Sequence, residues 1–268
     1  MHYEYFDCQI HNGTAAVSLQ GLGSPPLAEL CDEFIDLMLR LQDDDTVRVI
    51  LIREGDQYFD QTPDLDRIAQ GKCDGEEFSS LTPDLDIARK IVTIIQEIAK
   101  PVVAAARGSV RESGFGFYLA ADIHLASTSA SFTAPDLSRG LMPDWGLTAT
   151  LPRLLGPSRT LELIWSRRTI NAEEAGQIGL VDRVIEDEAW EEELAAFVER
   201  LSNLPQPAVQ LTKLAVQQAL HLDMTSMLAY EYEAQQQCWN SQETREGMAA
   251  FMAGRNPEFT RSPLEEEE

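Results

Sequence analysis

The order of strand-like and helix-like segments limits the fold of this chain more than any other feature. Two short runs of buried β-type residues, 47–52 and 101–106, each follow a stretch with apolar residues at helical spacing. Those preceding stretches cover residues 27–41 and 84–98, where apolar positions recur every three or four residues. Helices and strands that alternate in this way predict crossover units and therefore an α/β core.

The last third of the chain has a different pattern. Two further strands are expected near 123–126 and 181–185, and beyond them the periodicity is almost wholly helical. The expected helices cover residues 187–203, 207–220, 225–239 and 242–253. The sequence therefore predicts an α/β core over residues 1–190 and a helical region over 191–268. Because this region keeps many apolar positions, it must cover the core or pack on another subunit.

The charge of the chain argues against two classes of partner. Aspartate and glutamate total 45 against 21 lysine and arginine, so the formal net charge of the 268 residues is −24. Proteins that bind nucleic acid need clustered positive charge to displace the counterions of phosphate groups. Anionic membrane surfaces attract basic segments for the same reason. We therefore expect neither a nucleic-acid partner nor a membrane partner.

Targeting and metal-binding signals are weak. No apolar run approaches the roughly 18 residues that cross a bilayer, and the first residues lack the basic and apolar regions of a signal peptide. The four cysteines are far apart and form no CxxC pair, as expected of reduced thiols. The four histidines form no HxxxH or HExxH pattern, so no metal site is predicted. The cytoplasm is the expected compartment.

A series of motifs between Lys100 and Ile185 carries most of the functional information. In chain order these are KPVVAAARG (100–108), SGFG (113–116), ADIHLAS (121–127), ASFTAPD (130–136), GLMP (140–143), LPRLLG (151–156) and GLVDRV (179–184). Read in this order, the chain closely resembles the crotonase family, which is the enoyl-CoA hydratase/isomerase superfamily. The resemblance also includes the strand at 49–52 before it and the segment 246–259 after it, so it covers nearly the whole chain.

The resemblance implies a specific architecture and substrate. It implies an α/β, crotonase-like core of repeated ββα turns that form a spiral, followed by a C-terminal helical trimerisation region. Homotrimers, often paired into hexamers, are implied as well. The implied substrates are acyl-CoA thioesters, with coenzyme A as part of the substrate and no separate cofactor. Two backbone N–H groups would hold the thioester oxygen as the enolate forms.

The two implied N–H donors are unequal in this sequence. The second donor lies in a glycine triplet at a helix start, and here the triplet reads Glu112-Ser113-Gly114. Ser113 still supplies an N–H, and Gly114 keeps the backbone approachable. The first donor falls on Pro63, which has no N–H. Either the N–H of Asp64, followed by Leu65, replaces it, or this half of the oxyanion hole is missing.

The carboxylates also depart from the pattern of the hydratases, which use two glutamates. The first glutamate aligns with Gly116 and is absent, whereas the second aligns with Asp136. Asp144 is a further candidate, because its position resembles that of the aspartate in dienoyl-CoA isomerases and chlorobenzoyl-CoA dehalogenases. Trp145, next to it, offers an apolar wall that would raise a carboxyl pKa. Asp136 and Asp144 are therefore the predicted catalytic residues.

Two interpretations of function remain open at this point. The first is an enzyme that acts on an acyl-CoA through a stabilised enolate, with isomerisation or single-carboxylate chemistry preferred over hydration. The second is a family member without catalysis that serves as a binding or assembly subunit. The replacements at Pro63 and Gly116, together with Glu112, favour the second interpretation. Asp136 and Asp144 favour the first.

The distal part of the substrate is less well defined by the sequence. Lys213 lies where family members often place a lysine near the phosphates of coenzyme A, although an exposed lysine on a helix is the interpretation we favour. A thioester on a carrier protein, or a diketone, is an open alternative to a CoA thioester. The strongly acidic chain does not obviously suit an acidic carrier protein.

Overall fold

The structure is a computed structural model of the chain. It describes residues 3–19, 27–53, 59, 73–75, 83–135 and 137–259. Within these ranges, every helix is too short or too polar to cross a membrane.

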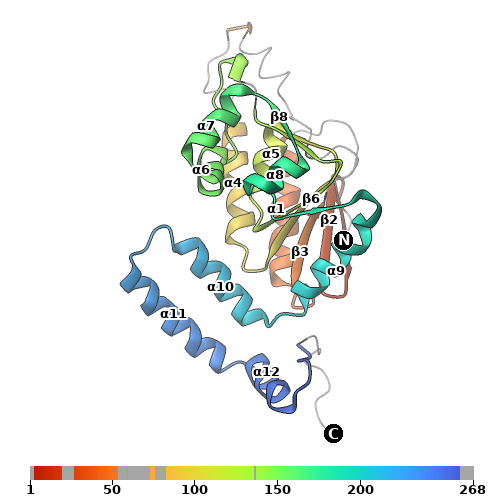
Figure 1. Ribbon diagram of the computed structural model, residues 1–268, viewed down its shortest axis with the longest axis vertical. Helices are drawn as coiled ribbons and strands as arrows, with labels where there is room; N and C mark the ends of the chain where they lie inside the picture. The colour runs from red at the N-terminus through yellow and green to blue at the C-terminus, as the bar shows by residue number, and fades with distance from the viewer. Residues whose placement is uncertain are drawn as a thin grey trace.

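A twisted sheet forms the centre of the molecule (Figure 1). Within the described residues it has six strands in the order β1-β2-β3-β4-β6-β9. Their bounds are β1 Phe6–His11, β2 Thr14–Leu19, β3 Val49–Arg53, β4 Val102–Ala106, β6 Ile123–Ser127 and β9 Arg183–Ile185. Only the pair β1–β2 is antiparallel among these neighbours, and the others are parallel. Spatial order thus follows chain order, as expected for successive crossovers that turn in one direction.

The alternation of helices and strands did not predict the antiparallel pair β1–β2. Asn12 and Gly13 join β1 to β2 with φ values of 47° and 77°. Two consecutive residues with positive φ form the tight turn that suits the twist of a hairpin, and Asn-Gly is its commonest sequence. The hairpin extends the sheet beyond β3.

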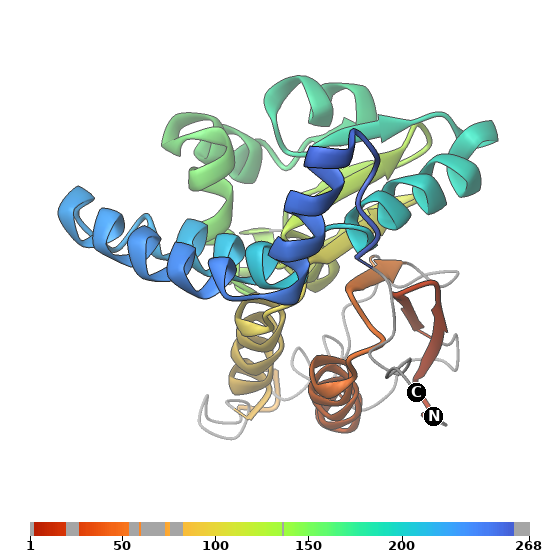
Figure 2. The same ribbon diagram turned by 90° about the horizontal axis from the view of Figure 1, so that it is seen from below.

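The two faces of the sheet are covered by different helices, because side chains alternate along each strand. On β3, Ile50 and Ile52 share a buried cluster with α1 (Leu27–Asp43) and α4 (Pro83–Glu97). Val49 and Leu51 face the other way and pack against α9 (Trp190–Ser202). Figure 2 shows these helices on opposite sides of the strands. The predicted α/β core is confirmed.

A smaller sheet positions the candidate site. Its strands, within the described residues, run in the order β5-β7-β8, with bounds β5 Ser109–Arg111, β7 Ser131–Thr133 and β8 Thr169–Asn171. Because β5 and β7 are parallel, with Arg111 opposite Thr133, their carboxyl ends lie side by side. Helix α5 (Glu112–Leu119) begins directly after β5, and the segment with Asp136 follows β7.

Three helices close this side of the molecule before the chain returns to the central sheet. They are α6 (Leu147–Leu155), α7 (Pro157–Ser166) and α8 (Ala172–Ile178). Asn171 caps α8 by accepting a hydrogen bond from the N–H of Glu174. Leu147 and Leu151 of α6 are buried in the main core, so α6 and the loop before it have a fixed place beside α5.

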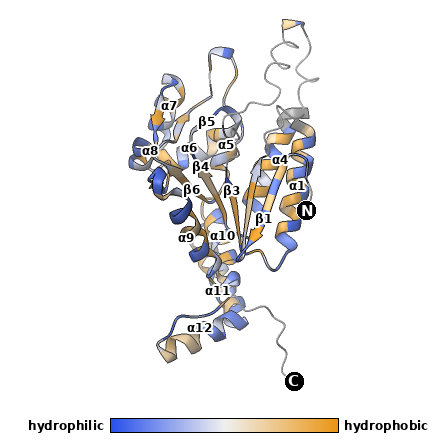
Figure 3. Cartoon of the chain, turned by 90° about the vertical axis from the view of Figure 1, so that its right-hand side faces the viewer, coloured by the Kyte–Doolittle hydropathy of each residue, from blue (hydrophilic) through white to orange (hydrophobic). Residues whose placement is uncertain are grey.

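Three helices follow, of which the first contacts the edge of the core and the next two extend beyond it (Figures 1 and 3). They are α10 (Gln206–Gln218), α11 (Met224–Trp239) and α12 (Gln242–Ala253). Arg48, just before β3, forms a 2.9 Å ion pair with Glu243 of α12, and this contact links α12 to the core. The division of the chain at residue 190 stays a prediction, and the helix that starts there, α9, packs on the sheet.

Lys213 on α10 corrects one expectation. Its side chain is only 7% exposed, and its Nζ forms a 2.8 Å ion pair with Oδ2 of Asp122 at the start of β6. The same Nζ donates to the carbonyl oxygen of Lys100 at 3.1 Å. The prediction that Lys213 is exposed is therefore wrong, because α10 packs against the edge of the core and brings the Lys213 ammonium next to the carboxylate of Asp122.

Candidate active site

Three of the predicted site residues fall within the described part of the chain. These are Ser113, Gly114 and Asp144. The other predicted residues, Asp64, Leu65 and Asp136, lie outside the described residues, as does Pro63. Ser113, Gly114 and Asp144 are placed by α5 and by the loop that precedes α6.

The start of α5 has an unusual backbone. Glu112 is its first residue and has a φ of 52°, in the left-handed region that favours glycine. Ser113 is the second residue, and the N–H groups of a first helical turn point out of the helix end. The partial positive charge of that end favours a negatively charged group. The predicted donor at Ser113 therefore occupies a position suited to an oxyanion.

Gly114 is required by a close approach of backbone. A Cβ atom at this position would lie 2.7 Å from the Cα of Phe59 and closer still to its carbonyl group. Phe59 is fully buried, and its ring makes an edge contact with Tyr118 of α5, with 5.4 Å between ring centroids. The missing side chain of Gly114 thus leaves room for the backbone of Phe59 against the first turn of α5.

Gly116 has the same kind of contact with a different segment. A Cβ atom there would lie 2.7 Å from the carbonyl oxygen of Trp145 and closer still to the Trp145 Cβ. The Trp145 ring meets Phe117 edge-on, with centroids 6.5 Å apart. The loop before α6 is therefore packed directly on α5. The place where the resemblance puts the first glutamate of the hydratases is filled by this loop.

Asp144 lies in that loop, next to Trp145. Trp145 and Gly146 have φ values of 50° and 76°, and the carbonyl of Asp144 accepts the first hydrogen bond of α6, from Leu147 N–H at 3.0 Å. Asp144 is exposed at the surface, yet neighbouring atoms displace part of its water. This partial burial, and then the nearby carboxylate of Glu112, raise the pKa of Asp144. A raised pKa makes the ionised carboxyl a stronger base.

Glu112 itself is held by an ion pair. Its two carboxylate oxygens accept from the two terminal nitrogens of Arg139, at 2.9 and 3.0 Å. Arg139 ends a short 3-10 turn, Leu137–Arg139, that follows the carboxyl end of β7. The negative side chain that the sequence places at the start of α5 is thus turned toward a cation.

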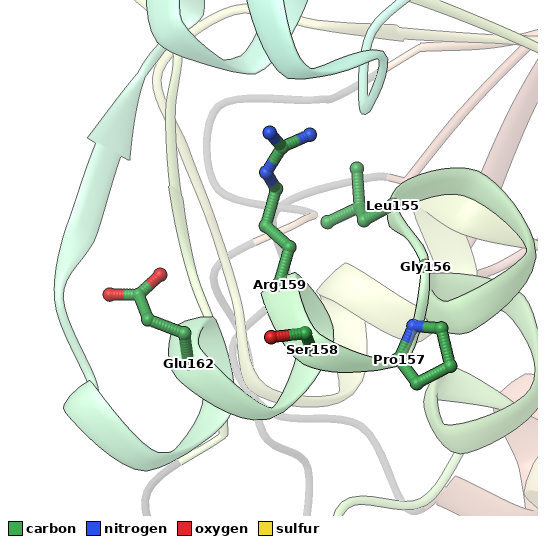
Figure 4. Close-up of a pocket in the computed structure, with 6 residues that line it drawn as sticks. All are labelled: Leu155, Gly156, Pro157, Ser158, Arg159 and Glu162. Atoms are coloured by element: carbon green, nitrogen blue, oxygen red, sulfur yellow. The ribbon is translucent and has the colours of Figure 1, made fainter.

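A depression elsewhere on the surface is separate from these residues. It has a volume of about 530 Å³ and lies at the junction of α6 and α7 (Figure 4). Its lining residues are Leu155, Gly156, Pro157, Ser158, Arg159 and Glu162. The predicted site residues are not among them. Within the described ranges, no three His, Cys, Asp or Glu side chains are grouped so that they could hold a metal ion.

Comparison with known proteins gives this site a context. The sequence profile described as enoyl-CoA hydratase/isomerase matches residues 27–262. The chain belongs to the enoyl-CoA hydratase/isomerase family. This family is the crotonase superfamily, so the resemblance drawn from the motifs is confirmed, and the chain is an enzyme of that superfamily.

Relatives in the enoyl-CoA hydratase/isomerase family include both hydratases and isomerases. The crotonyl-CoA hydratase of Syntrophomonas wolfei is 30% identical over 229 residues, which are 85% of this chain and 86% of that protein. The 1,2-epoxyphenylacetyl-CoA isomerase of Escherichia coli is 28% identical and covers 87% of this chain and 88% of its own. The solved structure of an enoyl-CoA hydratase/isomerase from Cupriavidus metallidurans is 28% identical, has a TM-score of 0.86 and covers 99% of this chain and 100% of its own. The crotonase-like fold is therefore confirmed.

Two features of this family member were not found from the sequence. One is the ion pair between Glu112 and Arg139, and the other is the contact that places Trp145 on Gly116. For the ion pair, the sequence held one signal, which is the charged residue Glu112 in a glycine triplet. The second had no signal, because it depends on how the loop before α6 returns to α5.

Proposed function

We propose that the chain isomerises a carbon–carbon double bond in an acyl-CoA thioester through an enolate. The observation that carries this proposal is the arrangement around α5. A carboxyl with a raised pKa, Asp144, lies beside the helix start, while the position of the first hydratase glutamate is filled by Trp145. The trans-2-decenoyl-[acyl-carrier-protein] isomerase of Streptococcus mutans, which is 27% identical over 94% of this chain and 96% of its own, adds support from outside the chain.

The thioester oxygen takes the place of an anion at the start of α5. The N–H of Ser113 is one donor, and the second comes from the segment of Asp64 and Leu65, which is a proposal from the sequence alone. Stabilisation of a developing oxyanion by such donors is commonly the largest single contribution to catalysis of this kind. Coenzyme A enters as part of the substrate, and the proposed chemistry needs no other cofactor.

Asp144 is the proposed base. It removes a proton from the carbon between the thioester and the double bond, and the released electron pair moves onto the thioester oxygen as a dienolate. The double bond shifts when a proton returns to the far carbon of the dienolate. Asp136 is the proposed acid that donates a proton to that far carbon, and exchange with solvent then removes the proton from Asp144 and reprotonates Asp136. Water addition is disfavoured because the hydratase route needs a carboxylate where Gly116 lies.

The proposal is tested with a panel of 3-enoyl-CoA and 2-enoyl-CoA thioesters of different chain lengths. Isomerisation creates a conjugated enoyl thioester and raises ultraviolet absorbance, whereas hydration of a 2-enoyl thioester lowers it. We expect absorbance to rise with a 3-enoyl substrate. Asp144→Asn should lower this rate by about 10²–10⁴-fold.

A matched control is Asp32→Asn, which changes an exposed aspartate on α1 and should keep the full rate. Asp136→Asn tests the second carboxyl in the same assay. If both Asp136→Asn and Asp144→Asn keep full activity on a confirmed substrate, the assignment is wrong. If no thioester is turned over, the interpretation as a binding or assembly subunit replaces it.

We also propose that the chain forms a homotrimer or a hexamer. Helices α10–α12 and the turn between α10 and α11 carry large apolar side chains that are exposed in the single chain. They include Val216, Leu220, Met224, Leu228, Tyr232, Trp239, Met248, Phe251 and Met252. An exposed apolar surface of this extent is typical of a protein–protein interface. Figure 3 shows the apolar end of α12 at a distance from the core, where a second subunit could cover it.

A further inference from the structure

We propose that Arg139 is a positioning residue whose task is to neutralise Glu112, so that the start of α5 can hold a negatively charged enolate. This inference rests on the proposed function and adds to it a residue pair that this chain carries in place of a plain glycine start. Arg139 does not touch the substrate in this proposal. It acts through Glu112.

The geometry of the pair is that of a strong, specific contact. The guanidinium of Arg139 meets Glu112 through two nitrogens, at 2.9 and 3.0 Å, which fixes both the distance and the plane of the contact. The Glu112 side chain is 18% exposed and that of Arg139 is 38% exposed. The carboxylate is therefore the more enclosed partner and depends on Arg139 for compensation.

The pair joins the two segments that carry the site. Glu112 follows β5, and Arg139 ends the turn that follows β7, its parallel neighbour. The N–H of Gly140 donates to the carbonyl oxygen of Leu137 at 2.9 Å and closes that turn. The loop with Asp144 begins immediately afterwards. Arg139 thus lies at the base of the loop and bonds it to the first residue of α5.

The charges explain why neutralisation matters. A helix start favours an anion, but an uncompensated carboxylate on its first residue repels one. Among the described residues, Glu112 is the charged group that acts on the carboxyl of Asp144, where it raises the pKa together with burial, and Arg139 is its cationic partner. Without Arg139, Glu112 would oppose both the enolate and the ionised form of Asp144.

The test compares two thioester probes by calorimetric titration. Acetoacetyl-CoA forms a stable enolate and carries the added negative charge, whereas butyryl-CoA is uncharged at the acyl group. We expect Arg139→Gln to lower the affinity for acetoacetyl-CoA about tenfold, which is the size of a charge effect at a helix end. The affinity for butyryl-CoA should fall less than about threefold. The double variant Arg139→Gln with Glu112→Gln should regain the affinity for acetoacetyl-CoA, because the repelling charge is gone.

Arg168→Gln is the matched control. Arg168 is 37% exposed and is paired with Glu162 and Glu174, away from α5, so its loss should leave both affinities unchanged. Arg139→Lys should retain most of the affinity for acetoacetyl-CoA, because it keeps the charge while losing the two-nitrogen geometry.

Several outcomes would overturn the inference. If Arg139→Gln lowers the affinity for both probes equally, the pair only supports the loop. The same conclusion follows if the double variant binds acetoacetyl-CoA as weakly as Arg139→Gln does. Unchanged binding in Arg139→Gln would show that it has no role, and a wild-type chain that binds neither probe overturns the inference too. Failure of the proposed isomerisation is recognised separately, since it is the absence of turnover in the wild-type chain and does not enter the comparison of affinities.

Discussion

The backbone of Trp145 occupies the space that a side chain at Gly116 would need, with the Trp145 carbonyl oxygen only 2.7 Å from the position of a Cβ atom. This contact does two things at once. It removes the room for a second carboxylate on α5, and it brings the neighbouring Asp144 beside that helix. One contact therefore both excludes a side chain at position 116 and fixes the loop that carries Asp144 next to α5.

Gly116→Ala should destabilise the protein. The added methyl group must push the Trp145 backbone away, and such overpacking costs about 1–3 kcal/mol. Urea unfolding at fixed protein concentration measures the change. Gly247→Ala on α12 is the control, since a Cβ there meets only ordinary contacts, 3.6 Å from Phe259, and alanine favours a helix. A Gly116→Ala protein as stable as the wild type would contradict the contact.

The pH dependence of turnover should report the raised pKa of Asp144. As a base this carboxyl must be ionised, so kcat/KM should fall as the pH drops below its pKa. Because the pKa of Asp144 lies above the ordinary carboxyl pKa of 3.8, kcat/KM should begin to fall at a pH above 3.8. A pH–rate profile on the confirmed substrate measures it, with Asp32→Asn as the control. A rate that stays constant down to the ordinary value would rule out Asp144 as the base.

The contribution of Asp144 to the stability of the fold should decrease as the pH rises, which is the opposite of the trend in kcat/KM. The pKa of Asp144 is higher in the folded chain than in the unfolded chain, so the folded state binds this proton more tightly. Its contribution to stability is fully present below the unfolded pKa and is lost as the pH rises through the folded value. Asp144→Asn should remove this part of the pH dependence when unfolding is compared across that window. An identical pH dependence in both proteins would argue against the shift.

Lys213→Met should destabilise the protein by about 3–5 kcal/mol, because it leaves the carboxylate of Asp122 without its cation in a mostly enclosed place. The double variant with Asp122→Asn should recover much of this loss. Lys90→Met is the control, since its ion pair with Asp86 at 3.2 Å is exposed and contributes less than about 1 kcal/mol. Equal effects of the two lysine substitutions, measured by urea unfolding, would contradict the buried pair.

The assembly is measured by light scattering after size-exclusion chromatography. We expect a mass of three or six times the 29.9 kDa of one chain at micromolar concentration. Phe251→Asp should reduce it, because this 81% exposed side chain lies on α12 and would bring a charge into the interface. Leu39→Asp on α1 should leave the mass unchanged. A wild-type mass of one chain would refute the proposed trimer.

The sequence was informative where the structure depends on neighbours along the chain. Periodicity placed α1, α4 and the three C-terminal helices within a few residues of their bounds, because an amphipathic stripe is a local property. Ser113 and Gly114 lie at the start of α5, as the motifs implied. The hairpin at Asn12-Gly13 also had a local signal, the residue pair that favours positive φ.

Contacts between distant segments could not be predicted in this way. Lys213 meets Asp122, 91 positions earlier, and its burial follows from where α10 crosses the core. Trp145 meets Gly116 for a similar reason, since loop geometry decides which backbone atoms touch. Sequence patterns identify the residue types at a site, whereas the space left around them depends on the assembled fold.

The docking of Phe59 on Gly114 has a consequence for chimeric enzymes. Because the backbone of Phe59 fills the space left by Gly114, Phe59 and the start of α5 have to fit each other closely. A designer who exchanges α5 for that of a hydratase must transplant both halves of the joint. Exchange of the helix alone would place a foreign first turn against the Phe59 backbone and break this contact.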